Sequence, residues 1–454
     1  MSNEHAPNEA PASRRQFLAR TGALAAGGLV AARSAAVAQP PQAPAPVIPE
    51  VAVDESGRVR PLRPAQQLAA VTRYDVATFT EGSAQLTLLR QAVQTMRNRA
   101  DSDPTSWMYQ ANIHNIFCNT PPAPYGVVHY SWRFLAWHRA YLWYFEKVLQ
   151  DAVGNDPRLT LPYWNWTTEL NLPATYFGAS NPLNDPTRQV TPTSKLDPRR
   201  TAISGLLALP TFTQFGGSAS DAGALETGPH NYVHSWVCGD MCRFSTAARD
   251  PIFWAHHANV DRVWYLWNQE GNTNPTDTAW TGQTYPFYDV TQKKNVTISF
   301  GDAAQLPVTY APPVGTTIST GGRKRLNAPV TVQALPAGGE LDVAPAASAG
   351  SLRVVAIDVP QDAPISVNVF ARSGATAQTP TSDPSFVGAF TLIPTDGGHG
   401  AHGPVNLHVP LARLAPRLLS AEARTPLNLT LVPTATPGNS RMGTVSFERL
   451  ELQP

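Results

Sequence analysis

The sequence predicts a multidomain protein. A mainly α-helical domain covers residues 39–300, a linker covers 301–325, and a C-terminal antiparallel β-sandwich domain covers 326–454. Three observations support this prediction: an apolar run free of proline and glycine before residue 300, a change of composition near it, and short β-branched runs beyond it. A length of 454 residues allows each domain to bury its own core.

The composition excludes several classes of protein. The formal net charge is +1 and only 15% of the residues are charged, which argues against a nucleic-acid or polybasic membrane binder. A hydrophobic fraction of 42% with 11 tryptophans excludes a disordered chain. Three cysteines cannot form a disulfide framework.

The N-terminus predicts an export signal over residues 1–38. Arg14 and Arg15 stand beside Phe17-Leu18, an Ala/Gly/Leu-rich stretch follows, and Ala36-Val37-Ala38 offers a cleavage site. This order resembles a twin-arginine signal, which predicts the twin-arginine machinery as a partner and a periplasmic or extracellular location. No other segment approaches a transmembrane length.

Four helices are predicted before residue 300. The first has its apolar face at Leu86, Leu89, Val93 and Met96, and the others cover Trp132–Leu149, 225–238 and 251–268. Long loops rich in Pro, Asn, Thr and Gly fill 167–222. Beyond the linker, the predicted strands are Val330–Val332, Leu352–Val359, Ile365–Ala371, Phe386–Ile393, Val405–Leu411, Leu427–Val432 and Thr444–Leu450.

Seven of the 11 histidines lie between positions 114 and 257. His230 and His234 are spaced i and i+4, so both rings project from one face of a helix. His257 and Asp261 share that spacing, and the acid could orient the ligands or hold the helix. The other candidates are His114, His129 and His138. A single buried histidine is typically bonded to a backbone carbonyl, but two sets of three favour a pair of copper, zinc or iron ions.

Two runs of residues resemble the tyrosinase and polyphenol oxidase family. The run from His129 through Phe134-Leu135-Ala136-Trp137-His138-Arg139 to Leu142 and Glu146 is similar to the copper A pattern of that family. The run from Asp250-Pro251-Ile252-Phe253-Trp254 through His256-His257 to Asp261 is similar to its copper B pattern. Several details resemble the plant enzymes, although their N-terminal disulfide cysteines are missing here.

The resemblance implies a four-helix bundle around two copper ions. It implies His114, His129 and His138 as ligands of one ion, His230, His234 and His257 as ligands of the other, and His256 as a packed neighbour that does not bind metal. It also implies a thioether between Cys118 and His129, with a free buried thiol as the alternative. Cys238 and Cys242 have no counterpart in the family, and local packing or a local bridge is expected of them.

The resemblance implies an oxidase that uses O2 to hydroxylate monophenols and to oxidise catechols to o-quinones. Glu226 and Asn231 would together activate the water that deprotonates a monophenol, unless Glu226 merely starts a helix and Asn231 is solvated. Phe244 would stack over copper B and gate the site, or else pack on the core. The C-terminal domain would cover the copper entrance.

Alternative functions remain open from the sequence. A catechol or o-aminophenol oxidase would lack the hydroxylation step, and a dioxygen carrier would use the same copper pair without catalysis. A zinc hydrolase is disfavoured because no acidic ligand accompanies the histidines at the usual spacing.

Overall fold

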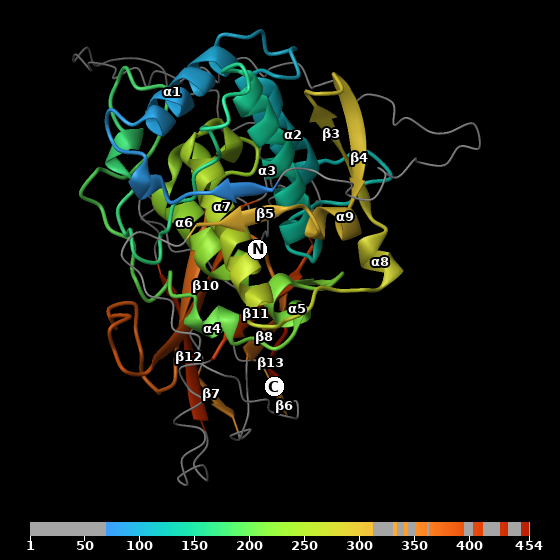
Figure 1. Cartoon of the computed structure of the whole chain (residues 1–454). Coiled ribbons are helices and arrows are strands. Elements are labelled where there is room, and N and C mark those ends of the chain that lie inside the picture. Colours follow the sequence, from blue (N-terminus) through green and yellow to red (C-terminus); the bar gives the residue numbers. More distant parts are fainter. Residues whose placement is uncertain are drawn as a thin grey trace, which may run out of the picture. The chain divides into compact units, whose positions relative to one another are not determined.

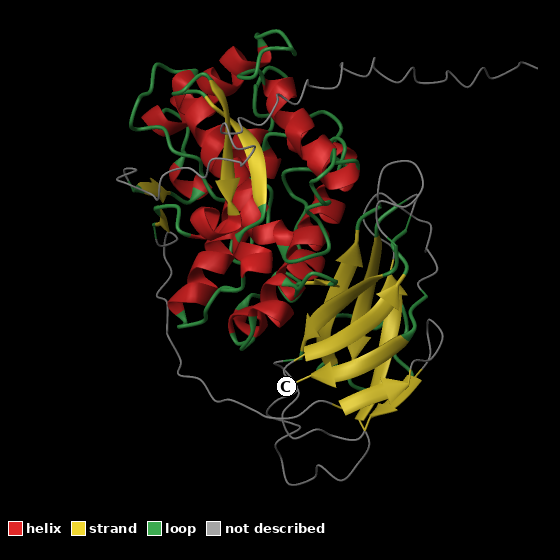
Figure 2. Cartoon of the chain, turned by 90° about the vertical axis from the view of Figure 1, so that its right-hand side faces the viewer, coloured by secondary structure: helices red, strands yellow, loops and turns green. Residues whose placement is uncertain are grey.

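The computed structural model describes residues 70–311, 330–333, 340–343, 351–360, 363–394, 403–411, 427–434 and 446–453. The predicted signal, 1–38, and residues 312–325 of the predicted linker lie outside these ranges. The helical part and the C-terminal strands lie within one compact unit, Pro44–Pro454. Figure 2 shows the helices in red and the strands in yellow.

The N-terminal part is mainly helical (Figure 1). Its helices are α1 (Ala84–Arg97), α2 (Trp107–Asn119), α3 (Arg133–Asp151), α4 (Ser204–Leu207), α5 (Phe212–Gly216), α6 (Asn231–Val237), α7 (Ile252–Gln269), α8 (Thr278–Thr281) and α9 (Phe300–Ala304). Shorter helical turns are η1 (Val76–Thr78), η2 (Ala174–Tyr176), η3 (Glu226–His230), η4 (Gly239–Cys242) and η5 (Ala247–Arg249). None of the helices in the described ranges has both the length and the apolar character needed to cross a bilayer.

Local sequence explains where the helices begin. The hydroxyl of Ser83 accepts a hydrogen bond from the Leu86 N–H at the start of α1, and the hydroxyl of Ser106 accepts one from the Tyr109 N–H at the start of α2. The predicted helices over Trp132–Leu149 and 251–268 are confirmed as α3 and α7. The predicted helix over 225–238 is interrupted at Gly228, whose φ of −83° and ψ of −111° are not helical, so η3 and α6 are separate elements.

Two small sheets belong to the helical part. Strands β3 (Thr284–Asp289) and β4 (Lys294–Ser299) pair as an antiparallel hairpin, and β1 (Val71–Arg73) pairs in parallel with β5 (Val308–Tyr310). The prediction that the linker starts at residue 301 is therefore wrong for 301–311. Strand β5 pairs with β1, which lies 237 residues earlier in the chain, and no local sequence pattern indicates this pairing.

The C-terminal part contains two sheets. One has the order β10-β9-β12-β7 and the other has the order β2-β11-β8-β13-β6. Their strands are β2 (Asp221–Ala222), β6 (Val330–Gln333), β7 (Glu340–Val343), β8 (Ser351–Ile357), β9 (Ile365–Phe370), β10 (Phe386–Leu392), β11 (Val405–Pro410), β12 (Leu427–Thr434) and β13 (Arg449–Gln453). The last predicted strand, Thr444–Leu450, is placed too early, since β13 begins at Arg449.

Strand β2 joins the helical part to the C-terminal part. It lies between α5 and η3 in the chain but pairs in parallel with β11, with Asn406 opposite Asp221. Arg353 in β8 donates to both oxygens of the buried Asp221 carboxylate, at 2.8 and 2.9 Å. This ion pair and these strand hydrogen bonds hold the five-stranded sheet against the residues that precede η3.

Candidate metal centre

Six histidine side chains come together in the interior of the helical part. Every one of these side chains is at most 2% exposed. They come from α2 (His114), the segment before α3 (His129), α3 (His138), the junction of η3 with α6 (His230), α6 (His234) and α7 (His257). Aromatic side chains such as Phe134, Phe244 and Phe253 pack against the histidine rings, so water has little access to them.

The Nδ1 atoms of four of these rings face oxygen atoms that can only accept. The Nδ1–H of His114 donates to the Phe244 carbonyl at 2.8 Å and that of His138 to the Phe134 carbonyl at 2.8 Å. The Nδ1–H of His234 donates to the Met241 carbonyl at 2.7 Å, and that of His230 donates to the Asn231 side-chain oxygen at 2.8 Å. A carbonyl has no proton to give, so these contacts place the single proton of each neutral ring on Nδ1.

The Nε2 atoms of the rings point at one another. The distance is 3.4 Å between His129 and His114, 3.3 Å between His230 and His257, and 3.2 Å between His234 and His257. The buried Nε2 of His138 has no hydrogen-bond partner among the described residues. The ring protons of His114, His138, His230 and His234 lie on Nδ1, so the Nε2 atoms of these four rings carry lone pairs that a cation beside them would bind.

Burial prevents the rings from becoming cations themselves. Desolvation lowers the pKa of His114 to about 3 and that of His234 to about 4, and it holds the pKa of His257 well below its ordinary value. The rings are therefore neutral donors at pH 7. Neutral, all-nitrogen donor sets without carboxylates suit copper, zinc or iron rather than magnesium or calcium.

The potential ligand atoms form two groups, and within each group all atoms lie within 4.8 Å of one another. One contains His114, Cys118 and His129, and the other contains His230, His234, His256 and His257. The first includes the predicted cross-link partners, with Cys118 as a buried thiol. The ring of His138 lies beside this group, with its centroid 5.1 Å from that of His129 and 5.6 Å from that of His114.

His256 belongs to the second group only by proximity. Its Nδ1 accepts a hydrogen bond from the Trp166 ring N–H at 3.0 Å, and its ring stacks on His230 with centroids 5.2 Å apart. Its Nε2 atom is buried without a partner in the described residues. His256 is therefore held by packing and by Trp166, and its Nε2 atom is the nitrogen without a partner among the described residues.

The sequence did not indicate two phenylalanines that separate and support the rings. Phe134 has its ring centroid 4.7 Å from that of His138 and 4.6 Å from that of His230, so it lies between the two sets. Phe253 lies 4.8 Å from His114 and 4.2 Å from His257. Both occur inside the family-like runs, but nothing in the spacing distinguishes them from ordinary core residues.

Phe244 does not lie where the sequence placed it. Its ring stacks on His129 with centroids 4.0 Å apart and planes 19° from parallel, and its carbonyl holds His114. It thus contacts the first histidine set, and the expected stack over the second set is wrong. The reason is the path of the chain after α6, which returns across α2 before α7 begins.

Glu226 and Asn231 are both buried, at 1% and 0% exposure. Glu226 Oε1 accepts from the Tyr130 N–H at 2.7 Å and lies 2.9 Å from His129 Nδ1, while its Oε2 has no partner among the described residues. Burial raises the pKa of Glu226 well above its ordinary value. Asn231 holds His230 with its oxygen and donates to the Thr391 carbonyl at 2.6 Å with its amide.

Asp261 does not orient a metal-binding ring. Its carboxylate binds Arg139 at 2.6 Å and Arg73 at 3.3 Å, and it accepts from the Tyr310 hydroxyl. The His257 Nδ1, one turn earlier, has no hydrogen-bond partner among the described residues. Of the two roles expected for Asp261, the structure supports the one that holds the helix, because the acid links α7 to β1, α3 and β5.

Replacing Asp261 with asparagine should therefore affect stability more than metal binding. Breaking a buried ion pair leaves guanidinium groups without their countercharge, so we expect the free energy of unfolding to fall by about 3–5 kcal/mol. Urea unfolding of the metal-free chain measures this loss. A variant of wild-type stability that loses metal instead would show that Asp261 acts on His257.

Comparison with known proteins agrees with this geometry. Residues 104–201 and 180–270 match the profile of the common central domain of tyrosinase. This stretch of the chain resembles the tyrosinase and polyphenol oxidase family. The match covers the elements that carry all six histidines, from α2 to α7.

Individual relatives match the chain only in part. It is 35% identical over 251 residues to the latent polyphenol oxidase of Prunus armeniaca, covering 45% of this chain and 42% of the relative. It is 33% identical over 252 residues to a tyrosinase of Hahella sp., covering 44% of this chain and 54% of the relative. The chain thus matches about half the length of these relatives.

The fold likeness extends further along the chain. The solved structure of latent apple tyrosinase superposes with a TM-score of 0.68, covering 87% of this chain and 99% of that one at 21% identity. The fold of the chain is therefore similar to that of latent apple tyrosinase, with a helical core and a C-terminal region that contains sheets. The family also implies a binuclear copper centre, and the two histidine groups fit such a centre.

Proposed function

We propose that the protein is an exported copper-dependent phenol oxidase that hydroxylates monophenols at the ortho position and oxidises catechols to o-quinones. Its substrates would be small phenols and O2. The observation that carries the proposal is the convergence of the buried rings of six histidines. The tyrosinase domain that contains them supports copper as the metal.

Two copper ions would be held by the two predicted sets, His114, His129 and His138 on one side and His230, His234 and His257 on the other. When bound, the copper pair supplies the redox chemistry with O2. The chain itself fixes the rings through their Nδ1 hydrogen bonds and excludes water. We further propose that the helices with these residues form a four-helix bundle and that the two C-terminal sheets form an antiparallel sandwich.

For export, we propose a signal over residues 1–38 that uses the twin-arginine route to the periplasm or the cell exterior. Arg14 and Arg15 carry this proposal. A precursor in which both are changed to lysine should remain inside the cell, as fractionation would show.

Hydroxylation of a monophenol requires removal of its proton, whose pKa is about 10. We propose that Glu226 and Asn231 hold the water that accepts this proton. The unpartnered, buried Oε2 of Glu226 supports this role, because a buried carboxylate oxygen needs a donor.

Changing Glu226 to glutamine should separate the two activities. Loss of a general base typically costs about 10²–10⁴-fold in rate, and we expect that loss for a monophenol such as tyramine, with less than about a tenfold loss for the matching catechol. O2 uptake on both substrates measures the ratio. Equal losses on the two substrates would assign Glu226 to holding His129 instead.

The structure also supports a role of Glu226 in holding His129. Glu226 Oε1 lies 2.9 Å from His129 Nδ1, so the acid also serves to orient a ring. A wild type that oxidises catechols and leaves monophenols unchanged would be a catechol or o-aminophenol oxidase without hydroxylation. A protein that binds O2 but leaves every catechol unchanged would instead be a dioxygen carrier.

We propose a thioether between Cys118 and His129. The ligand atoms of these two residues lie within the same 4.8 Å group, and the thiol is fully buried. In a mass spectrum of the digested copper-loaded protein, the cross-linked peptide pair should be lighter by two hydrogen atoms than the summed masses of the two unlinked peptides. Cys118→Ser should abolish the link, and separate, unlinked peptides from the loaded wild type would contradict the proposal.

We also propose that the C-terminal part covers the approach to the copper pair. The hydroxyl of Tyr130, next to His129, donates to the Ile393 carbonyl and accepts from the Ile393 N–H, each at 2.9 Å. Asn231, next to His230, donates to the Thr391 carbonyl. The end of β10 therefore rests on the neighbours of one ligand from each set.

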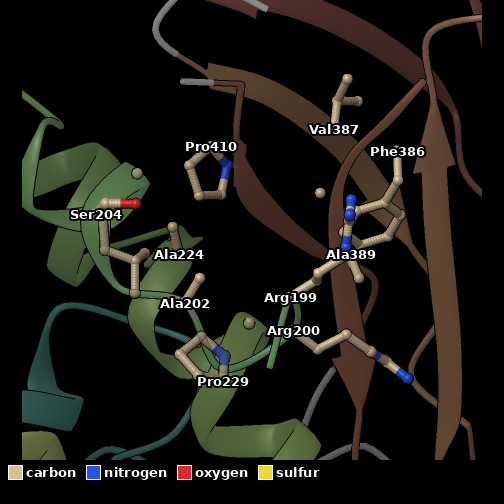
Figure 3. A pocket seen from close by; sticks show the side chains of 14 residues that line it. Arg199, Arg200, Ala202, Ser204, Ala224, Pro229, Phe386, Val387, Ala389 and Pro410 are labelled. Carbon is tan, nitrogen blue, oxygen red and sulfur yellow. The ribbon is translucent and has the colours of Figure 1, made fainter. Parts of the chain in front are cut away.

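Packing between the cover and the helical part is incomplete. A cavity of about 260 Å³ lies beside these contacts, with Ala202, Ser204 and Pro229 on the helical side and Val387 and Pro410 on the strand side (Figure 3).

A further inference from the structure

We propose that the Cys238–Cys242 disulfide is a positioning element that fixes one imidazole in each histidine set. The bridge joins two cysteines only four residues apart, directly after α6. The proposal rests on the proposed function in one respect, because it takes these imidazoles as metal ligands.

The loop that starts with this bridge supplies two of the carbonyls that hold the rings. The Met241 carbonyl lies inside the bridged segment and accepts from His234 of the second set at 2.7 Å. The Phe244 carbonyl, two residues beyond Cys242, accepts from His114 of the first set at 2.8 Å. One short loop therefore determines the orientation of a ring on each side of the centre.

The same loop also packs against a third ring. The side chain of Phe244 stacks on His129 with centroids 4.0 Å apart. A shift of the loop would therefore move a stacking surface and two hydrogen-bond acceptors together.

The backbone of the loop has a conformation that needs support. Cys238 has φ of 50° and Gly239 has φ of 61°, so two successive residues lie in the left-handed region. A side chain with a Cβ adopts this region at a cost, and Gly239 cannot accept one, because its Cβ would lie 2.3 Å from the Thr187 carbonyl. The bridge holds Cys238 in this conformation by linking it to the far end of the turn.

Other hydrogen bonds also hold the loop, and two of them act at Asp240. The Asp240 N–H donates to the Thr187 hydroxyl at 2.9 Å, and the Thr246 hydroxyl donates to the Asp240 carbonyl at 2.8 Å. These contacts fix Asp240 but leave the peptide groups of Met241 and Phe244 to be set by the turn. Without the bridge we expect those two carbonyls to sample other directions, and the rings of His234 and His114 to follow them.

Removal of the bridge should therefore weaken metal binding without unfolding the chain. Loss of a partner that orients a ligand typically lowers metal affinity by about 10–100-fold. The test compares the full-length copper-loaded wild type with the double variant Cys238→Ser and Cys242→Ser, following transfer of copper to a chelator. A matched control is Val93→Ala in α1, a buried site far from the loop in sequence that lowers thermal stability without touching either carbonyl.

A second measurement uses the metal-free full chain and does not depend on copper. A phosphine reductant converts the disulfide to two thiols and takes up oxygen from water to become the phosphine oxide, and air oxidation then restores the bridge. Nitrogen-15 labelling of histidine reports the Nδ1 protons before and after. We expect those of His114 and His234 to exchange faster after reduction and to recover on reoxidation, whereas that of His138, held inside α3, stays protected.

The outcomes are distinct. Faster copper release from the double variant than from Val93→Ala, with selective loss of the His114 and His234 ring protons, would support the positioning role. Equal copper release in the two variants, or ring protons that do not respond to reduction, would overturn it. A wild type that binds no copper would contradict the proposed function, while the ring-proton measurement would still test the positioning role.

Discussion

Replacing His257 with glutamine should leave about one copper ion per chain and lower catechol oxidation by about 10³-fold or more. His257 Nε2 lies 3.3 Å from that of His230 and 3.2 Å from that of His234, so it completes the second set. Its ring also stacks on His138 of the first set, with centroids 4.4 Å apart. Copper analysis of the purified variant, together with O2 uptake on a catechol, measures both effects.

The neighbouring residue provides a matched control. His256→Gln removes an imidazole from the same turn of α7, but this ring is held by Trp166 and lies against His230. We expect about two coppers per chain and a loss of activity below about tenfold in this variant. If His256→Gln lost a copper and His257→Gln kept both, the assignment of the two adjacent histidines would have to be reversed.

Separation of the C-terminal part should raise the rate on catechols by roughly tenfold or more. In the full chain every ligand ring is at most 2% exposed, and Thr391 and Ile393 bond to the neighbours of His230 and His129. We therefore expect a phenol to reach the rings only after displacement of that strand end. Limited proteolysis within 312–329, followed by rate and copper measurements, tests this.

A point variant should weaken the attachment of the C-terminal part without cleavage of the chain. Arg353→Gln removes both hydrogen bonds to Asp221 that fasten the five-stranded sheet to β2, so we expect a smaller increase in rate with copper content unchanged. Cleaved protein with the rate of the intact chain, after the C-terminal part has been removed, would show that this part does not block the site.

Sequence patterns predicted the elements that depend on local periodicity. The apolar runs of α3 and α7 and the strands β8 to β12 agree with the structure because each pattern repeats within the element itself. His230 and His234 were found because their spacing follows helix geometry, and the other four because they cluster in the sequence and their context resembles a family. The break at Gly228 was not predicted, since glycine and proline are tolerated near a helix start.

Features that depend on contacts between distant segments could not be read from the sequence. Strand β2 has two residues and acquires its partner β11 only in the folded chain. Asp261 meets Arg73 and Arg139, 188 and 122 residues away, rather than the histidine one turn before it. Phe244 reaches His129 because of the path of its loop, which no spacing rule specifies.

Copper analysis of the purified full-length protein tests the central claim most directly. If the six buried histidines bind metal as the two proposed sets of three, the protein should retain about two copper ions per chain after removal of loosely bound metal. About one copper, or zinc in place of copper, would contradict a paired centre of this kind.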